Sequence, residues 1–159
     1  MEKQDRSFME LALEEAREAA RLGEVPIGAV LIGPEGEILG RGHNLREKKQ
    51  DPTAHAEVLA LQEAARRLGT WRLEGSTLYV TLEPCPMCAG AIMLARVERL
   101  VYGAADPKGG AIESLLNLYE YRGFNHQVSY QGGVLAEKCS KVLSDFFRDL
   151  RKGRVSESG

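Results

Sequence analysis

Cysteine, histidine and tryptophan are scarce in this sequence: its 159 residues include three Cys, three His and one Trp. Three cysteines are too few for the disulfide framework of a small secreted domain. Long apolar runs are also missing, since none approaches the roughly 18 residues that a membrane-spanning helix needs. The charged start, residues 1–6, lacks the apolar segment of a secretory signal peptide. We therefore expect a cytoplasmic protein with no part in a membrane.

Charge of one sign is not in excess either. The formal net charge is −2, which argues against a protein that coats nucleic acid through its overall positive charge. A local basic patch stands near the C-terminus, where Arg148, Arg151, Lys152 and Arg154 are accompanied only by Asp149. These cations suit contact with phosphates, but they equally suit a solvated helix end, where positive charge favours the helix dipole.

The remaining composition is that of an ordinary globular protein, with 43% hydrophobic and 28% charged residues. A chain of 159 residues is long enough to bury one substantial core. No repeat, low-complexity tract or internal linker divides it. We expect a single domain over residues 1–154, followed by a short polar tail over residues 155–159 that is disordered.

Two short strings carry the chemistry: His55-Ala56-Glu57 and Pro84-Cys85-Pro86-Met87-Cys88. They supply one imidazole, two thiols and one carboxylate. Structural zinc sites are closed by four protein ligands, whereas catalytic sites use three and leave a position for water. Three ligands beside a carboxylate that can move protons therefore indicate hydrolytic chemistry.

Apolar periodicity and turn residues predict helices interleaved with strands, and hence a sheet covered on both faces. The expected helices span residues 7–22, 52–68, 86–95, 113–120 and 137–152, and the expected strands span residues 25–32, 37–42, 77–82, 99–103 and 127–130. Ser7 fits a capping box with Glu10, and Thr53 fits an N-cap. Charged residues 46–51 are expected to form a surface loop. The lone Cys139 is interpreted as a buried, small apolar residue.

Both strings fall where a helix is expected to begin. Free N–H groups and the positive end of the helix dipole stabilise thiolates there, which suits Cys85 and Cys88 as metal ligands. Glu57 follows His55 by two residues, or about 200 degrees around a helix. The two can flank one pocket only if the helix start approaches it end-on. Taken alone, Glu57 would better suit a first-turn acid that favours the helix dipole, and the Cys pair downstream is what favours the catalytic role.

A lone Cys-x-x-Cys pair is only moderately specific. It could be half of a four-ligand zinc knuckle, for which Cys139, His43 and His126 are the remaining candidate ligands, or a redox pair. A redox role would leave the His55-Ala56-Glu57 string without a purpose.

At these residues the chain resembles the zinc-dependent nucleobase deaminases, whose signature is H-x-E followed by P-C-x-x-C. Within that superfamily it is most similar to the bacterial tRNA-specific adenosine deaminases, over about residues 8–151. The zinc strings mark the superfamily, whereas the Asp145-Phe146-Phe147-Arg148 segment is typical of the tRNA enzymes. Further similar segments lie at residues 23–29, 51–57, 78–85 and 123–126.

The resemblance implies a three-layer α/β/α fold of the cytidine deaminase type, with a central mixed five-stranded sheet, and a homodimer. It implies conversion of adenosine to inosine at the wobble position (34) of a tRNA anticodon loop, with release of ammonia. One zinc ion per subunit would be held by His55, Cys85 and Cys88, and Glu57 would move the protons. Residues that would bind the substrate are Ile27, Asn44, Ala56, Asp106, Lys108, Asn125, Phe147 and Arg148.

Some of these roles are specific. Asn44 would hydrogen-bond the purine, the N–H of Ala56 would face the C6 substituent, and Ile27 would pack on the base. Asn44 also suits a plain turn residue after the hairpin. One segment departs from the family, because Ile112-Glu113 stands where small residues are usual. The RNA contacts of the 106–114 loop are therefore open.

Two rival functions have to be weighed. A deaminase of a free base, guanine above all, would share the zinc signature, and only the C-terminal Phe146-Phe147-Arg148 segment favours tRNA over it. A zinc-stabilised interaction module would need a closed four-ligand site and would give Glu57 no role.

Overall fold

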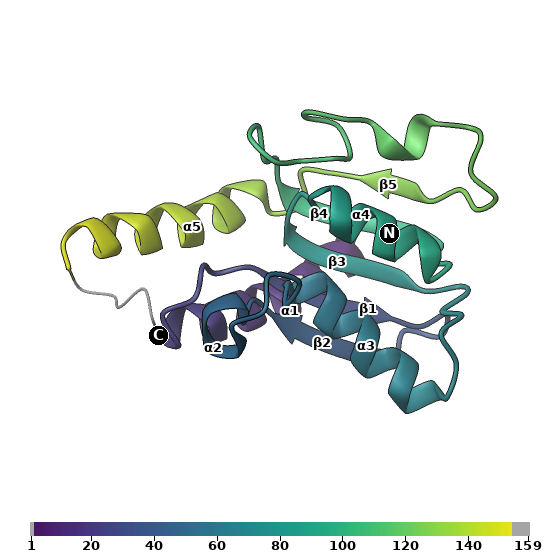
Figure 1. Ribbon diagram of the computed structural model, residues 1–159, viewed down its shortest axis with the longest axis horizontal. Coiled ribbons are helices and arrows are strands. Elements are labelled where there is room, and N and C mark those ends of the chain that lie inside the picture. Colours follow the sequence, from purple (N-terminus) through teal and green to yellow (C-terminus); the bar gives the residue numbers. More distant parts are fainter. Residues whose placement is uncertain (1, 154–159) are drawn as a thin grey trace.

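Five strands form one mixed sheet in the order β2-β1-β3-β4-β5 (Figure 1). They are Gly28–Ile32 (β1), Ile38–His43 (β2), Thr77–Leu82 (β3), Arg99–Ala104 (β4) and Ser129–Gln131 (β5). Strand β1 runs antiparallel to β2 and β3, whereas β3, β4 and β5 run parallel. The structure, a computed structural model, describes residues 2–153, so Arg154 and the expected tail over 155–159 lie outside it.

Helices cover both faces of the sheet. Helices Ala56–Leu68 (α3) and Pro86–Leu94 (α4) pack on one face, and Glu2–Arg21 (α1) and Ala136–Arg151 (α5) on the other (Figure 1). Strand β1 is buried on both sides: Ala29 and Leu31 face α3 and α4, while Val30 and Ile32 face α1 and α5. The expected three-layer α/β/α arrangement around a mixed five-stranded sheet is thereby confirmed.

Two glycines let α3 lie unusually close to β2. A Cβ atom on Gly40 would fall 2.3 Å from the carbonyl oxygen of Ala60, and one on Gly42 would fall 2.3 Å from that of Ala56. Any side chain at these positions would push the helix away from the sheet. The start of α3, which carries the first ligand string, is therefore held at a fixed height above the sheet.

The N-terminal region corrects two expectations. Helix α1 begins at Glu2 rather than near residue 7, so Ser7 lies inside the helix and forms no capping box. Its hydroxyl donates instead to the carbonyl of Lys3 at 3.2 Å, one helical turn back. Strand β1 begins at Gly28, three residues later than expected, after the segment that contains Pro26.

The segment before α3 also differs from the prediction. Residues expected to form a loop contain the short helix Arg46–Lys49 (α2). Helix α3 is capped by His55, not by Thr53. The hydroxyl and N–H of Thr53 both donate to Asp51, at 2.7 and 2.8 Å, so a turn precedes the helix.

The expected helix over 113–120 shrinks to one 3₁₀ turn, Leu118–Glu120 (η1). The N–H of Leu118 donates to Ala111, seven residues back, so regular helical bonding is replaced. Other local predictions are confirmed. Pro86 is the first residue of α4, Gly69 ends α3 with a φ of 71°, and Cys139 is 1% exposed in the core.

Candidate active site

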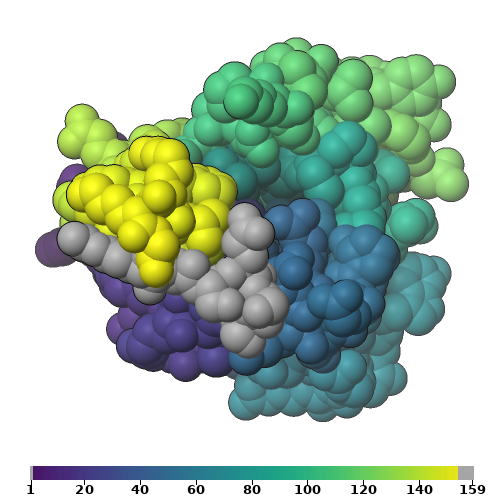
Figure 2. Space-filling model, turned by 60° about the vertical axis from the view of Figure 1, so that its left-hand side comes forward, coloured from purple at the N-terminus to yellow at the C-terminus, as the bar shows by residue number. Residues whose placement is uncertain are grey.

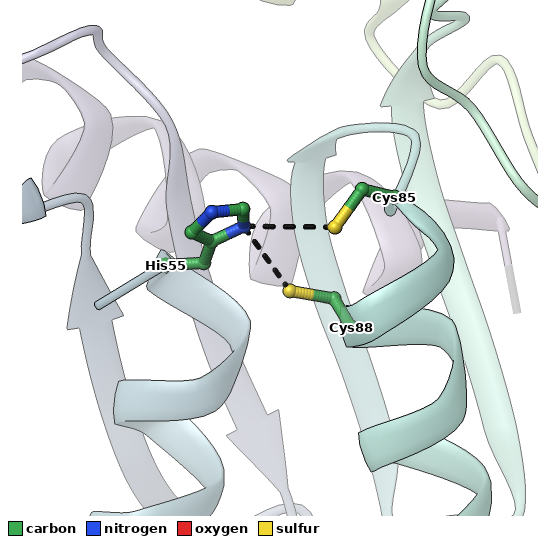
Figure 3. Close-up of side chains that lie close together, drawn as sticks. All are labelled: His55, Cys85 and Cys88. Atoms are coloured by element: carbon green, nitrogen blue, oxygen red, sulfur yellow. Dashed lines mark hydrogen bonds between the residues drawn. The ribbon is translucent and has the colours of Figure 1, made fainter. Parts of the chain in front are cut away.

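The two ligand strings lie at the starts of two neighbouring helices. His55 is the N-cap of α3 and Cys85 is the N-cap of α4, both with extended backbone angles. Neither side chain caps its own helix by a hydrogen bond. Both turn instead towards one point, which Cys88 reaches from the first turn of α4 (Figure 3).

The three side chains are spaced as metal ligands are. His55 Nδ1 lies 3.7 Å from Cys85 Sγ and 3.4 Å from Cys88 Sγ, and the three ligand atoms all lie within 4.8 Å of one another. A tetrahedral zinc ion at usual bond lengths separates its sulfur and nitrogen ligands by about 3.5 Å. The arrangement therefore fits a metal ion with three protein ligands.

The pKa values of the two thiols are shifted in opposite directions. The hydrogen bond from Cys88 lowers the pKa of Cys85 to about 4, and His55 acts in the same direction. The same hydrogen bond, together with burial, raises the pKa of Cys88. Cys85 therefore ionises the more readily of the two, and a cation between them would favour release of the proton of Cys88 as well.

Glu57 flanks this ligand set from the first turn of α3. It is the second helical residue, so the helix start approaches the pocket end-on, as its spacing from His55 requires. Its side chain is buried, with 4% of the residue exposed. Burial above all raises its pKa to about 7, and the nearby Cys85 thiolate adds to the effect. A carboxylate with this pKa can both accept and deliver a proton near neutral pH.

A cavity of about 300 Å³ opens above these groups. Five of the eight predicted substrate residues line it: Ile27, Asn44, Ala56, Asp106 and Phe147. Figure 2 views the molecule from the end where α5 lies, with α5 in yellow on the left of the view and the segment around α2 in blue on the right. Phe147, which is 40% exposed, brings α5 to the rim of the cavity.

The other three predicted substrate residues do not line the cavity. Lys108 and Asn125 are exposed on the loops after β4, and Arg148 is exposed on α5. Arg148 pairs with Asp145 at 3.2 Å, which offsets part of the positive charge expected of the basic patch. Their contact with RNA remains a prediction.

Asn44 occupies a turn and lines the cavity at the same time. It is 2% exposed, its amide donates to the carbonyl of Val25 at 3.2 Å, and its oxygen accepts from the N–H of Arg46 at 3.3 Å. These bonds correspond to the turn role that its position after the hairpin indicates. Its contact with a purine remains a prediction.

Sequence reasoning missed four residues that line the cavity, namely Val25, Arg46, Leu82 and Glu83. Arg46 brings a positive side chain to the wall. Glu83 is a buried carboxylate, 2% exposed, at the end of an apolar strand. Burial opposes its ionisation, but hydrogen bonds from Glu113, Ser114 and Asp106 outweigh burial and hold the pKa of Glu83 below its usual value. An acid directly after a buried strand was the available signal.

The segment that departs from the family turns away from the cavity. Ile112 is fully buried in the core under α3 and α4. Glu113 accepts a hydrogen bond from the hydroxyl of Tyr102. The bulk of Ile112 is therefore taken up inside the fold, whereas Glu113 is exposed beside Tyr102.

Comparison with known proteins gives one family for nearly the whole described chain. Residues 2–151 match the family of MafB19-like deaminases. The chain is 59% identical over 149 residues to the tRNA-specific adenosine deaminase of Bacillus subtilis (strain 168), covering 94% of this chain and 92% of the relative. It is 49% identical to the tRNA-specific adenosine deaminase of Haemophilus influenzae, covering 96% and 88%.

Solved structures agree. A structure from a study of A-to-I editing by tRNA:A34 deaminases at the wobble position of transfer RNA is 47% identical, with a TM-score of 0.82, over 86% of this chain and 99% of that one. A guanine deaminase from Nitrosomonas europaea, 23% identical over 89% of this chain and 83% of that one, has a TM-score of 0.74 and shares the fold. No described helix is long and apolar enough to cross a membrane.

Proposed function

Because the chain belongs to the MafB19-like deaminases and, among them, to the tRNA-specific adenosine deaminases, we propose that it converts adenosine to inosine at the wobble position, 34, of a tRNA anticodon. The reaction is hydrolytic and releases ammonia. One observation carries the proposal: the buried carboxylate of Glu57 stands beside a three-ligand His55-Cys85-Cys88 set at a cavity. A protein that edits tRNA works where tRNA is, in the cytoplasm.

The resident metal is zinc, one ion per subunit. His55, Cys85 and Cys88 would hold it, since one nitrogen and two thiolates at this spacing suit zinc. When bound, zinc acidifies a water molecule and so supplies the nucleophile at neutral pH. Three protein ligands leave one position of the tetrahedron for that water.

Glu57 moves the protons of the reaction. Its carboxylate takes one proton from the attacking water and delivers it to N1 of adenine as the C6–O bond forms. A second proton passes from the new hydroxyl group through Glu57 to the exocyclic amine, and the C6–N bond breaks to release ammonia. One water is consumed and one ammonia formed, so atoms and charge balance. Its pKa, raised by burial to about 7, suits a group that both takes and gives a proton.

The remaining predicted residues hold the substrate. Ile27 packs on the base, Asn44 hydrogen-bonds the purine, and the N–H of Ala56 faces the C6 substituent. Asp106 and Phe147 border the path of the flanking nucleotides, and an aromatic ring at the rim can stack on an unpaired base. Lys108, Asn125 and Arg148 contact RNA outside the cavity.

The test is to incubate the purified protein with an anticodon stem-loop that carries adenosine at position 34, and with free guanine in parallel. Nucleoside analysis by mass spectrometry should find inosine from the stem-loop and no product from guanine. Turnover of guanine alone would mean that the proposed substrate is wrong and that the rival free-base function is right. A Glu57→Gln variant shows whether any inosine is due to this site.

The assembly proposed is a homodimer, with the second copy seated on the groove between α3 and α4. This groove is almost entirely apolar and is lined by residues that include Leu61, Trp71 and Leu94. Trp71 is 55% and Leu94 63% exposed, a large apolar surface for a lone subunit. Leu94→Glu should shift the sedimentation coefficient to that of a monomer, with Leu68→Glu, 47% exposed on the far end of α3, as the matched control. A wild-type protein that sediments as a monomer at assay concentration would exclude this assembly.

A further inference from the structure

The loop over residues 105–117 reaches the cavity through Asp106 and has little regular structure. It connects β4 to the turn η1, and it carries Asp106 into the cavity wall. Within it, the carboxylate of Asp106 accepts the N–H groups of Lys108 and Gly109 at 3.1 and 3.2 Å, and the carbonyl of Asp106 accepts that of Gly110. These bonds are internal to the loop, so its position against the rest of the fold depends on contacts with other segments.

Glu83, a single carboxylate, provides such contacts. One of its oxygens, Oε1, accepts the N–H of Asp106 at 3.0 Å. The other, Oε2, accepts three successive N–H groups, from Ile112 at 3.1 Å, Glu113 at 2.8 Å and Ser114 at 3.0 Å. The hydroxyl of Ser114 also donates to Oε1. Both ends of the loop are therefore tied to one buried side chain.

The loop is also shaped to admit this side chain. A Cβ atom on Gly110 would lie 2.3 Å from the carboxyl carbon of Glu83 and within 2.5 Å of both its oxygens. Only glycine allows the backbone to pass so close. The N–H of Ala111 donates to the carbonyl of Pro84 at 2.8 Å, which ties the loop to the chain directly before Cys85.

We propose that Glu83 is a positioning residue for the substrate: it fixes the 106–114 loop, and through it Asp106 and Lys108, in the arrangement that receives the nucleotides flanking the target adenosine. This inference rests on the proposed function and adds to it the group that shapes the RNA-binding wall. Glu83 does not need to touch RNA. It acts through the four N–H groups that it holds.

The test is Glu83→Gln, which keeps the shape but replaces one accepting oxygen by an NH₂ group. That NH₂ would face N–H donors whichever way the amide is turned. The matched control is Glu37→Gln, since Glu37 likewise accepts a backbone N–H, from Glu35 at 2.9 Å, in the β1–β2 turn. Three quantities are measured for each variant: metal content, kcat and KM for the anticodon stem-loop, and hydrogen exchange of residues 106–114.

For Glu83→Gln we expect one metal ion per subunit, exchange at Ile112, Glu113 and Ser114 faster by at least about tenfold, KM higher by about tenfold or more, and kcat within about threefold of wild type. Glu37→Gln should match wild type in all three. A purely structural role would instead lower the fraction of active protein, and so lower apparent kcat with KM unchanged. That result would overturn the inference.

Gly110→Ala tests the same contact from the loop side. It should raise KM in the same way. The KM of the double variant should not exceed that of the more strongly affected single variant, because both changes disrupt the same contact. Fully additive effects would contradict a shared contact. If the wild-type protein deaminates the stem-loop and Glu83→Gln leaves KM unchanged, the inference fails while the proposed function stands. If wild type turns over no RNA, the proposed function fails, and the inference fails with it.

Discussion

Two buried carboxylates on opposite faces of the sheet behave in opposite ways. Glu57, on the α3 face, has its pKa raised to about 7, chiefly by burial. Asp5, on the α1 face, is also buried, yet hydrogen bonds from Arg99 and Tyr79 outweigh the effect of burial and lower its pKa. Arg99 binds both oxygens of Asp5, at 2.9 and 2.8 Å, and the hydroxyl of Tyr79 donates at 2.7 Å.

The two acids differ in their partners as well as in how deeply their carboxyl groups lie. Asp5 meets a guanidinium that neutralises it and ties α1 to β3 and β4, so its proton is absent at working pH. For Glu57, burial and the nearby Cys85 together raise the pKa to about 7, so the group can both hold and release a proton near neutral pH. One buried acid is therefore neutralised by its partner, whereas the other keeps a pKa suited to proton exchange.

The sharpest way to test this division is to remove a buried cysteine from each face. Cys88→Ser should lower zinc affinity by more than about a hundredfold, because loss of a direct ligand exceeds the effect of losing a group that only orients one. Activity should fall with the metal content, measured by elemental analysis. Cys139→Ser, on the α5 face, should keep the metal and lose only stability. Equal metal loss in both variants would contradict the assignment.

Replacing the acid of the α3 face should abolish chemistry without unfolding the protein. We expect Glu57→Gln to lower kcat by about 10²–10⁴-fold, since a proton-transfer group is lost. Metal content should stay at one ion per subunit, and the melting temperature should not fall, because an amide carries no charge to bury. A variant that keeps zinc and full activity would show that Glu57 is not the base.

Replacing Asp5, the acid of the α1 face, should lower stability and leave activity unchanged. Asp5→Asn leaves Arg99 without its anionic partner, and we expect the free energy of unfolding to fall by about 2–3 kcal/mol with kcat unchanged. Chemical denaturation measures the first and the stem-loop assay the second. Asp145→Asn, which removes an exposed carboxylate paired with Lys141 and Arg148, serves as control and should leave the free energy of unfolding close to that of wild type.

The smallest expected effect is the pH dependence of the stability that Asp5 contributes. The pKa of Asp5 is lower in the folded than in the unfolded protein, so its ion pair contributes fully above the unfolded value of about 3.9. This contribution is lost as the pH falls towards the folded pKa. The stability gap between wild type and Asp5→Asn should therefore narrow below about pH 4. A gap that stays constant from pH 7 to pH 3 would mean that Asp5 acts by packing alone.

Features that depend on residues close together in the sequence could be predicted from it. The β-rich run before Pro84, with Pro86 after it, places a strand and then a helix start, and the ligand spacing follows from that. The capping box at Ser7 was wrong because a helix already in progress offered its hydroxyl a carbonyl one turn back. Nothing near Glu24 or Glu83 in sequence reveals their partners.

Those partners come from the folded chain. Glu24 accepts the N–H groups of Glu47 and Lys48, at 3.1 and 2.7 Å, and so supports the short helix α2 that charge patterning read as a loop. Glu83 binds backbone groups 23 to 31 residues away. Each bond joins segments that are brought together by the sheet, so no short stretch of the sequence reveals which groups these two carboxylates bind.

The bare backbone of Gly42 has a consequence for engineering. A methyl group on Gly42 would collide with the carbonyl oxygen of Ala56, the residue between His55 and Glu57. Such a change would move the start of α3 away from the sheet, and with it both side chains of the first string. The spacing between β2 and α3 is therefore a means of changing metal affinity without replacing His55, Cys85 or Cys88.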